Sequence, residues 1–201
     1  DLFCGAGGAA VGYARAGFEV VGVDIKPQPH YPFEFIQADA LEFLDAGGAD
    51  GFDVIHASPP CQAFSRAQRI QKRVHPDLIG PTRQRLKGLV YVIENVPGAP
   101  LRNHVVVCGL FFSLGVERHR WFESRLQIKG TTCPGSVPTS KMGRPPEEGK
   151  LMHVVGHFSG VQAAREAMGI DWMVRDELSE AIPPAYTEFI GKQIIEHVLD
   201  G

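Results

Sequence analysis

The sequence predicts one α/β domain in which helices flank a mainly parallel β-sheet. Its first half alternates short apolar runs with helix-like stretches, the order that is typical of strands joined by crossover helices. A glycine-rich turn, "GAGG", separates the first apolar run from the first helix-like stretch. At 201 residues and 44% hydrophobic, the chain is also long and apolar enough for one domain with its own core.

The strands and helices of the first half follow one another along the chain. The tripeptide "DLF" ends a strand, and residues 7–17 form a helix that Gly17 closes. Apolar runs rich in β-branched and aromatic residues predict the next strands. The expected strands are 18–25, 33–39, 52–57 and 89–96, and the expected helices between them are 40–48 and 81–88.

The second half is less regular. In "ERHRWF", residues 117–122, a strand would place Arg118 and Arg120 on one face, because alternate residues of a strand point the same way. Residues 130–150 are rich in Gly, Pro, Ser and Thr, which predicts an irregular segment. The last helix is expected over 183–199, where two prolines suit its start.

Charge is distributed unevenly along the chain. The formal net charge is −3, yet residues 61–165 hold sixteen Lys and Arg against six Asp and Glu, and both flanking parts are acidic. The basic excess begins directly after Cys61. We therefore expect contact with a polyanion, with a solvated basic surface as the alternative.

The cysteines and the apolar runs limit the classes of protein that fit. The four cysteines are widely spaced and match no zinc-binding pattern, so we expect no metal and a reducing compartment such as the cytoplasm. Cys108 is expected in a core strand and Cys133 in a loop. No apolar run reaches the length of a membrane span and no signal peptide is visible, so no membrane partner is expected.

Several chemically active residues fall at or just beyond the ends of the expected strands. They are Asp1, Asp24, Asp39, Cys61 and Glu94. Each one alone fits a turn or a helix cap. Ligands of an open parallel sheet bind beyond the carboxyl ends of its strands, so the five together predict a site there.

The glycine-rich turn has the spacing of a nucleoside-binding loop. "GAGGAA", residues 5–10, satisfies the G-x-G-x-x-G/A template, and Asp24 follows at about the ~20 residues expected for a ribose-binding acid. The pattern fits a nicotinamide dinucleotide and S-adenosylmethionine equally well. A tight turn between a strand and a helix is the structural alternative.

Cys61 lies in "SPPCQAFS", residues 58–65, where two prolines stiffen the backbone before it. Attack by a thiolate needs an accessible sulfur in an electropositive setting, which Arg66 and Arg69 are placed to supply. Glu94 ends the next expected strand and suits a substrate that must be protonated as it is attacked.

Four stretches, in this order and spacing, resemble the motifs of the cytosine-5 DNA methyltransferase family: "DLFCGAGG", "PPCQAFS", "ENV" and "RHRWF". The stretch "SEAIPPAYTEFIGKQI" is similar to that family's last motif. The resemblance implies a Rossmann-like methyltransferase fold of the compact bacterial or phage type. It divides the chain into a catalytic domain, 1–123 and 166–201, and a short target-recognition segment, 124–165.

The resemblance also implies that S-adenosylmethionine is the cofactor and that no metal takes part. Phe3 would stack on the adenine, Asp24 would bind the ribose and Asp39 would accept from the exocyclic amine. The implied cofactor-binding residues are Phe3, Gly5, Gly7, Asp24, Ile25, Asp39, Ala40 and Pro60.

For the substrate, the resemblance implies a cytosine flipped out of double-stranded DNA. Cys61 would add to carbon 6, Glu94 would hold ring nitrogen 3, and Arg118 and Arg120 would contact the base. The implied substrate-binding residues are Gln62, Ser65, Arg66, Asn95 and Val96. Whether a restriction endonuclease or a partner subunit accompanies such an enzyme stays open, and the expected location is the cytoplasm of a bacterium or of a phage-infected host.

Three positions depart from the family's motifs, and other hypotheses stay open. Val116 stands where a glutamine is expected, and Ser179 and Glu180 replace a glycine and an asparagine. One alternative is methylation of RNA or of another cytosine substrate, and a second is a catalytically silent homologue that binds DNA and regulates a partner. A dehydrogenase would explain Asp24 and the glycine turn but not the "PPCQ" and "ENV" stretches.

Overall fold

The computed structural model describes residues 1–61, 64, 76–135, 137–141, 143–144 and 147–199. Its strands are β1 (Val21–Asp24), β2 (Glu34–Gln37), β3 (Ile55–Ala57), β4 (Tyr91–Asn95), β5 (Val105–Val107) and β6 (Arg120–Ser124). Its helices are α1 (Gly8–Ala16), α2 (Ala40–Asp45), α4 (Ile79–Arg85), the 3₁₀-helix η2 (Gly109–Phe112), α5 (Val161–Met168), α6 (Arg175–Glu180) and α7 (Pro184–Leu199).

The strands form one twisted layer with the order β2-β1-β3-β4-β6-β5, in which Leu2 joins the two halves. Leu2 bridges to Val23 of β1 on one side and to Ala57 of β3 on the other, both in parallel. The pairs β1·β2 and β3·β4 are parallel, whereas β6 runs antiparallel to β4 and β5. The mainly parallel sheet expected from the sequence is therefore confirmed.

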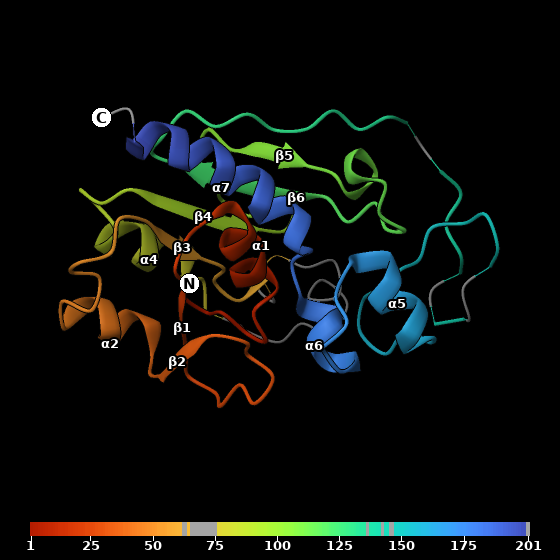
Figure 1. Ribbon diagram of the computed structural model, residues 1–201, viewed down its shortest axis with the longest axis horizontal. Coiled ribbons are helices and arrows are strands. Elements are labelled where there is room, and N and C mark those ends of the chain that lie inside the picture. The colour runs from red at the N-terminus through yellow and green to blue at the C-terminus, as the bar shows by residue number, and fades with distance from the viewer. Residues whose placement is uncertain (62–63, 65–75, 136, 142, 145–146, 200–201) are drawn as a thin grey trace.

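Helices cover both faces of this sheet, as the alternation of side chains along β4 shows. Val92 packs in a cluster with Tyr13 of α1 and Ile190 of α7, whereas the next residue, Ile93, packs with Ile79 of α4. Both strand residues are completely buried, because β4 lies in the middle of the layer. α1 and α7 lie side by side across one face, and α2 and α4 lie together at another side of the sheet (Figure 1).

Helix α1 has the ends that the sequence predicts. Gly7 and Gly17 flank it with φ angles of 85° and 108°, left-handed values that favour glycine at both positions. α1 packs so closely against α7 at Gly12 that a residue larger than glycine would not fit there. A Cβ atom at Gly12 would lie 2.0 Å from Thr187 Oγ1 and 2.2 Å from the carbonyl oxygen of Pro184.

Gly12→Ala is expected to destabilise the protein by about 1–3 kcal/mol, because the added methyl group has to push α7 away from α1. Urea unfolding measures this change. Gly80→Ala is the matched control, since Gly80 also lies in a helix but has no neighbour within 4 Å of an added Cβ. It should leave the free energy of unfolding unchanged or raise it by up to about 1 kcal/mol. Equal effects of the two substitutions would show that the α1–α7 contact is not tight.

A separate hydrophobic cluster holds the C-terminal third together. Met152, Val154 and Phe158 pack with residues of α5 and α6, and Val116 joins the same cluster. Figure 1 shows α5 and α6 next to each other, beyond the end of the sheet. Residue 165, the expected end of the recognition segment, lies inside α5.

The described part of 130–150 is irregular, as expected, with one isolated bridge between Thr139 and Leu151. The expected strand over 117–122 is wrong at its start, because β6 begins at Arg120 and Arg118 has a left-handed φ of 34°. α4 begins at Ile79, two residues before the helix expected over 81–88. In the described part of the chain, no helix has the length and apolar character needed to cross a membrane.

Candidate active site

A cavity of about 260 Å³ opens at the carboxyl ends of the strands, where the sequence predicts a site. The turn after Leu2, the ends of β1, β3 and β4, and the link between α6 and α7 contribute its walls. The predicted residues that line it are Phe3, Gly5, Asp24, Ile25, Pro60, Cys61, Glu94, Asn95, Val96 and Arg120.

Other predicted residues do not line this cavity. They are Gly7, Asp39, Ala40 and Arg118. Gln62, Ser65, Arg66 and Arg69 lie outside the described residues. A second cavity, of about 50 Å³, is lined mainly by apolar side chains such as Phe18, Val21 and Phe52, and no cysteine is among the described residues that line it.

The glycine turn and Asp24 form one hydrogen-bonded unit. The carboxylate of Asp24 accepts from the backbone N–H of Gly5 and of Lys26, each at 3.0 Å. Phe3 and Gly5 have positive φ angles of 56° and 49°, and an added Cβ at Gly5 would meet nothing within 4 Å. The turn therefore leaves open space against its backbone for a ligand. Because a carboxylate has about four acceptor sites, Asp24 retains capacity for ligand hydroxyl groups.

Ile25 and Asp39 differ in how they meet the expectation. Ile25 is 62% exposed at the rim of the cavity, an apolar surface suited to cover a flat ring. Asp39 caps α2, because its Oδ1 accepts from the N–H groups of Leu41 and Glu42 at 2.8 and 3.1 Å. The helix-cap alternative for Asp39 is thus correct, and a role toward adenine remains a prediction.

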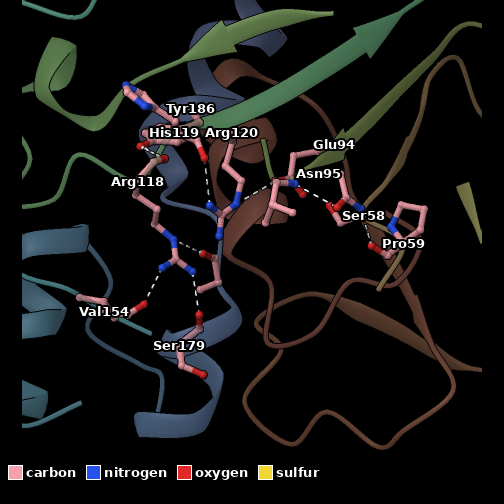
Figure 2. A network of polar contacts seen from close by, with 12 residues as sticks. Ser58, Pro59, Glu94, Asn95, Arg118, His119, Arg120, Val154, Ser179 and Tyr186 are labelled. Carbon is pink, nitrogen blue, oxygen red and sulfur yellow. Dashed lines mark hydrogen bonds and ion pairs between the residues drawn. The ribbon is translucent and has the colours of Figure 1, made fainter. Parts of the chain in front are cut away.

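Cys61 stands at the end of the loop that follows β3. The side chain of Asn95, on the neighbouring β4, donates to the carbonyl oxygen of Pro59 at 2.8 Å and so fixes this loop (Figure 2). Burial raises the pKa of the Cys61 thiol, while Arg120 opposes the shift and Glu94 and Glu180 add to it. The described surroundings therefore favour the thiol, and a thiolate needs further positive charge to form.

Glu94 is a buried carboxyl beside a buried guanidinium. Oε1 of Glu94 lies 3.0 Å from Nε of Arg120, as an ion pair without a well-directed hydrogen bond (Figure 2). Burial raises the pKa of Glu94, although Arg120 and a hydrogen bond from Ser58 act in the opposite direction. A carboxyl held this way is suited to give a proton and take it back.

A chain of hydrogen bonds that the sequence did not predict leads to Glu94. Tyr13 Oη lies 2.9 Å from His56 Nδ1, and His56 Nε2 lies 2.9 Å from Ser58 Oγ. Burial lowers the pKa of His56 to about 3, so its ring is neutral at pH 7. With Ser58 donating to Glu94, the neutral ring donates to Ser58 and accepts from Tyr13. This chain orients Ser58 and, through it, the carboxyl of Glu94.

Arg118 does not share the strand face of Arg120. Its guanidinium donates to the carbonyl oxygens of Val154, Ser179 and Ala181 at 2.6, 2.8 and 3.0 Å (Figure 2). The turn at Arg118 directs its side chain away from the cavity and toward the link between α6 and α7. The prediction that both arginines share one strand face is therefore wrong, because Arg118 lies before the strand begins and its guanidinium holds three backbone carbonyl groups in place.

Arg118→Ala is expected to destabilise the protein by about 2–4 kcal/mol, because three carbonyl groups lose a charged donor in a buried place. The free energy of unfolding in urea checks this. Arg125→Ala, at an exposed position, should change it by less than about 0.5 kcal/mol. A small effect at Arg118 would mean that water replaces the guanidinium.

Glu177 and Glu180 are cavity residues that the sequence did not predict. Both line the cavity from α6, together with Met173 and Ile182. Glu180 stands where the family's last motif has an asparagine, and this difference is the feature of the sequence that points to Glu180. With Asp24 and Glu94, these side chains make the wall rich in carboxyl groups, which suits a cationic ligand.

The architecture defines the class of protein, an α/β chain with the Rossmann-like fold of the methyltransferases. Residues 1–80 match the family model described as C-5 cytosine-specific DNA methylase. The matched part includes the glycine turn, Asp24 and Cys61. Over these residues the chain is similar to the C-5 cytosine-specific DNA methylases, in agreement with the resemblance of its motifs.

Curated relatives are similar to about half of the chain. Type II methyltransferase M.AgeI of Thalassovita gelatinovora is 32% identical in an alignment of 117 positions that covers 49% of this chain and 27% of the relative. Type II methyltransferase M1.HphI of Haemophilus parahaemolyticus is 32% identical in an alignment of 107 positions that covers 47% of this chain and 28% of the relative. Type II methyltransferase M.XorII of Xanthomonas oryzae pv. oryzae is 31% identical in an alignment of 126 positions that covers 52% of this chain and 29% of the relative. The alignments thus span less than a third of each of these relatives.

Proposed function

We propose that this protein is a DNA cytosine-5 methyltransferase that uses S-adenosylmethionine and forms a covalent bond between Cys61 and the target cytosine. One observation carries the proposal: Cys61, Glu94 and Arg120 line the same cavity as Asp24 and the glycine turn. A nucleophile and a proton donor therefore face the place where a nucleoside cofactor fits.

The cofactor half of the cavity fits S-adenosylmethionine on three counts. The open backbone at Gly5 admits a close approach, Asp24 offers acceptors to ribose hydroxyls, and Ile25 offers an apolar cover. The carboxylates of Glu177 and Glu180 complement a positively charged ligand. When bound, S-adenosylmethionine supplies a methyl group on a positively charged sulfur.

In the cytosine half, the thiol of Cys61 gives its proton to solvent water and Sγ forms a bond to carbon 6 of the ring. The π electrons of the C5–C6 bond shift to C4–C5 and those of C4–N3 move to nitrogen 3, which takes a proton from Glu94, so that carbon 5 becomes the nucleophile. After methylation, water takes the proton from carbon 5, the bond to sulfur breaks and the C5–C6 double bond is restored. The released thiolate regains a proton from solvent, and Glu94 recovers its proton from nitrogen 3.

The carboxyl of Glu94 contacts ring nitrogen 3 of the base, and the guanidinium of Arg120 contacts its carbonyl oxygen. Arg120 is mostly buried and has five donors in a fixed fork, which suits the carbonyl oxygen of cytosine. A base inside a duplex cannot reach a cavity at the strand ends, so the cytosine must flip out at a cost of a few kcal/mol. The basic stretch after Cys61 is suited to hold the DNA phosphates.

Transfer of labelled methyl from S-adenosylmethionine to duplex DNA, to RNA and to free cytidine nucleotides, measured in parallel, tests the proposal. Label in DNA that nuclease digestion recovers as 5-methylcytosine is the expected result. Label in RNA alone would establish the RNA alternative. Binding of DNA without any transfer would favour the silent homologue.

A further inference from the structure

Two cysteines far apart in the sequence meet a histidine outside the proposed active site. Cys108 directly follows β5, His119 directly precedes β6, and Cys133 comes from the irregular segment after β6. One ligand atom of each lies within 4.8 Å of the other two. Cys108 is buried and Cys133 is exposed, so the group runs from the protein interior to the surface.

The backbone around the three residues is held by contacts of its own. The N–H of Cys108 donates to Oγ1 of Thr131 at 2.9 Å, and the N–H of Thr131 donates to the carbonyl oxygen of Val106 at 2.9 Å. On the other side, the N–H of Gly109 donates to the carbonyl oxygen of Glu117 at 2.8 Å. These backbone contacts place the ligand atoms together, and Sγ of Cys108 also donates a hydrogen bond to Sγ of Cys133.

The Sγ–Sγ distance fits a hydrogen-bonded pair of thiols, is too long for a disulfide bond and lies close to the separation that a shared metal ion needs. Sγ of Cys108 and Sγ of Cys133 are 3.2 Å apart, well beyond the ~2.05 Å of a disulfide bond. Two thiolates on one tetrahedral zinc ion, at ~2.3 Å each, are about 3.7 Å apart. A shift of about half an ångström by the exposed Cys133 reaches that separation. Two thiolates and an imidazole are the donors that zinc prefers.

His119 has a carboxylate neighbour of the kind that orients metal-binding histidines. Oε1 of Glu117 lies 3.8 Å from Nε2 of His119. This is beyond hydrogen-bond distance; in zinc sites, a carboxylate that does accept from the second ring nitrogen fixes the ring and raises its basicity. The residue after His119 is Arg120, which begins β6 and lines the active-site cavity.

We propose that Cys108, His119 and Cys133 bind a zinc ion that fastens the start of the recognition segment to the β5–β6 edge of the sheet. The fourth position is taken by water or by a further ligand. The ion stands apart from the cavity at the strand ends and takes no part in methyl transfer. It holds in place the chain on both sides of β6, including the entry to Arg120. The expectation of no metal, which rested on cysteine spacing, missed this group because its members meet only in the folded chain.

Zinc content of the full chain, purified under reducing conditions and passed through gel filtration, tests the site. We expect about one zinc ion per chain in the wild-type protein. Cys133→Ser and His119→Ala should retain only a small fraction of that. Cys61→Ser and His157→Ala are matched controls, since Cys61 lies in the other cavity and His157 is exposed on a loop, and both should retain the wild-type content.

A second measurement on the wild-type chain covers the case of a variant that fails to fold. Cobalt added to metal-free protein should give the thiolate charge-transfer and visible bands of a tetrahedral site, and zinc should remove them. Absence of both zinc and the cobalt bands would overturn the proposal, as would unchanged zinc in Cys133→Ser and His119→Ala. A Cys108–Cys133 disulfide that, once reduced, takes up no metal would assign the pair to redox chemistry instead. None of these readouts depends on methyl transfer, so they test the zinc site independently of the proposed function.

Discussion

Cys61→Ala is expected to abolish methyl transfer while leaving the affinity for S-adenosylmethionine nearly unchanged. The sulfur acts on cytosine, and the contacts proposed for the cofactor come from Phe3, Gly5 and Asp24. Without the thiol, carbon 5 of cytosine has no route to become nucleophilic. Single-turnover transfer and calorimetric titration with the cofactor measure the two effects on the same preparation.

Asp24→Ala serves as the reciprocal variant. It removes the proposed acceptor for the ribose hydroxyls, so the affinity for S-adenosylmethionine should fall. The thiol of Cys61 is unchanged and can still form a covalent bond to a target cytosine. Unchanged affinity would place the cofactor elsewhere. Residual transfer by Cys61→Ala above the uncatalysed rate would give the nucleophilic role to another group.

Glu94→Gln is expected to lower the rate of transfer by about 10²–10⁴-fold, the usual contribution of a general acid. The amide has nearly the same shape but cannot give a proton to ring nitrogen 3. Because the pKa of Glu94 is raised by burial, the carboxyl in the wild-type protein retains its proton to higher pH than an exposed glutamate. A loss smaller than about tenfold would leave Glu94 with a structural role only.

Ser58→Ala provides a finer test of the same carboxyl. The hydrogen bond from Ser58 lowers the pKa of Glu94, so its loss should raise that pKa further. If the protonated form is the active one, the rate falls as pH rises through this pKa, and the falling limb of the pH–rate profile should move to higher pH in the variant. A limb that stays in place, with only a lower maximum, would show that Ser58 acts on packing alone.

Local features of the site were predictable from the sequence, because they follow from short-range rules. Glycine positions with left-handed φ, the helix that ends before Gly17, and the strand ends at Asp24 and Asn95 are properties of a few neighbouring residues. The parallel order of the strands then brings their carboxyl ends to one edge, so Asp24, Cys61 and Glu94 meet at a single cavity.

Features that depend on tertiary packing were not predictable in the same way. Alternation along a strand placed Arg118 beside Arg120, but a left-handed turn directs Arg118 to carbonyl groups contributed by residues 154, 179 and 181. His56 and Ser58 form a chain with Tyr13, which is more than forty residues away in the sequence. The group of Cys108, His119 and Cys133 likewise joins three separate segments.

Covalent trapping on duplex DNA with 5-fluorocytosine at the target position is the most direct test of the central claim, that Cys61 attacks the cytosine ring. Fluorine replaces the hydrogen that must leave carbon 5, so the bond between sulfur and carbon 6 cannot break after methylation. We expect a stable protein–DNA adduct that depends on S-adenosylmethionine and maps to the peptide containing Cys61. An adduct at Cys4, Cys108 or Cys133, or methylation of ordinary DNA with no adduct on the fluorinated substrate, would contradict it.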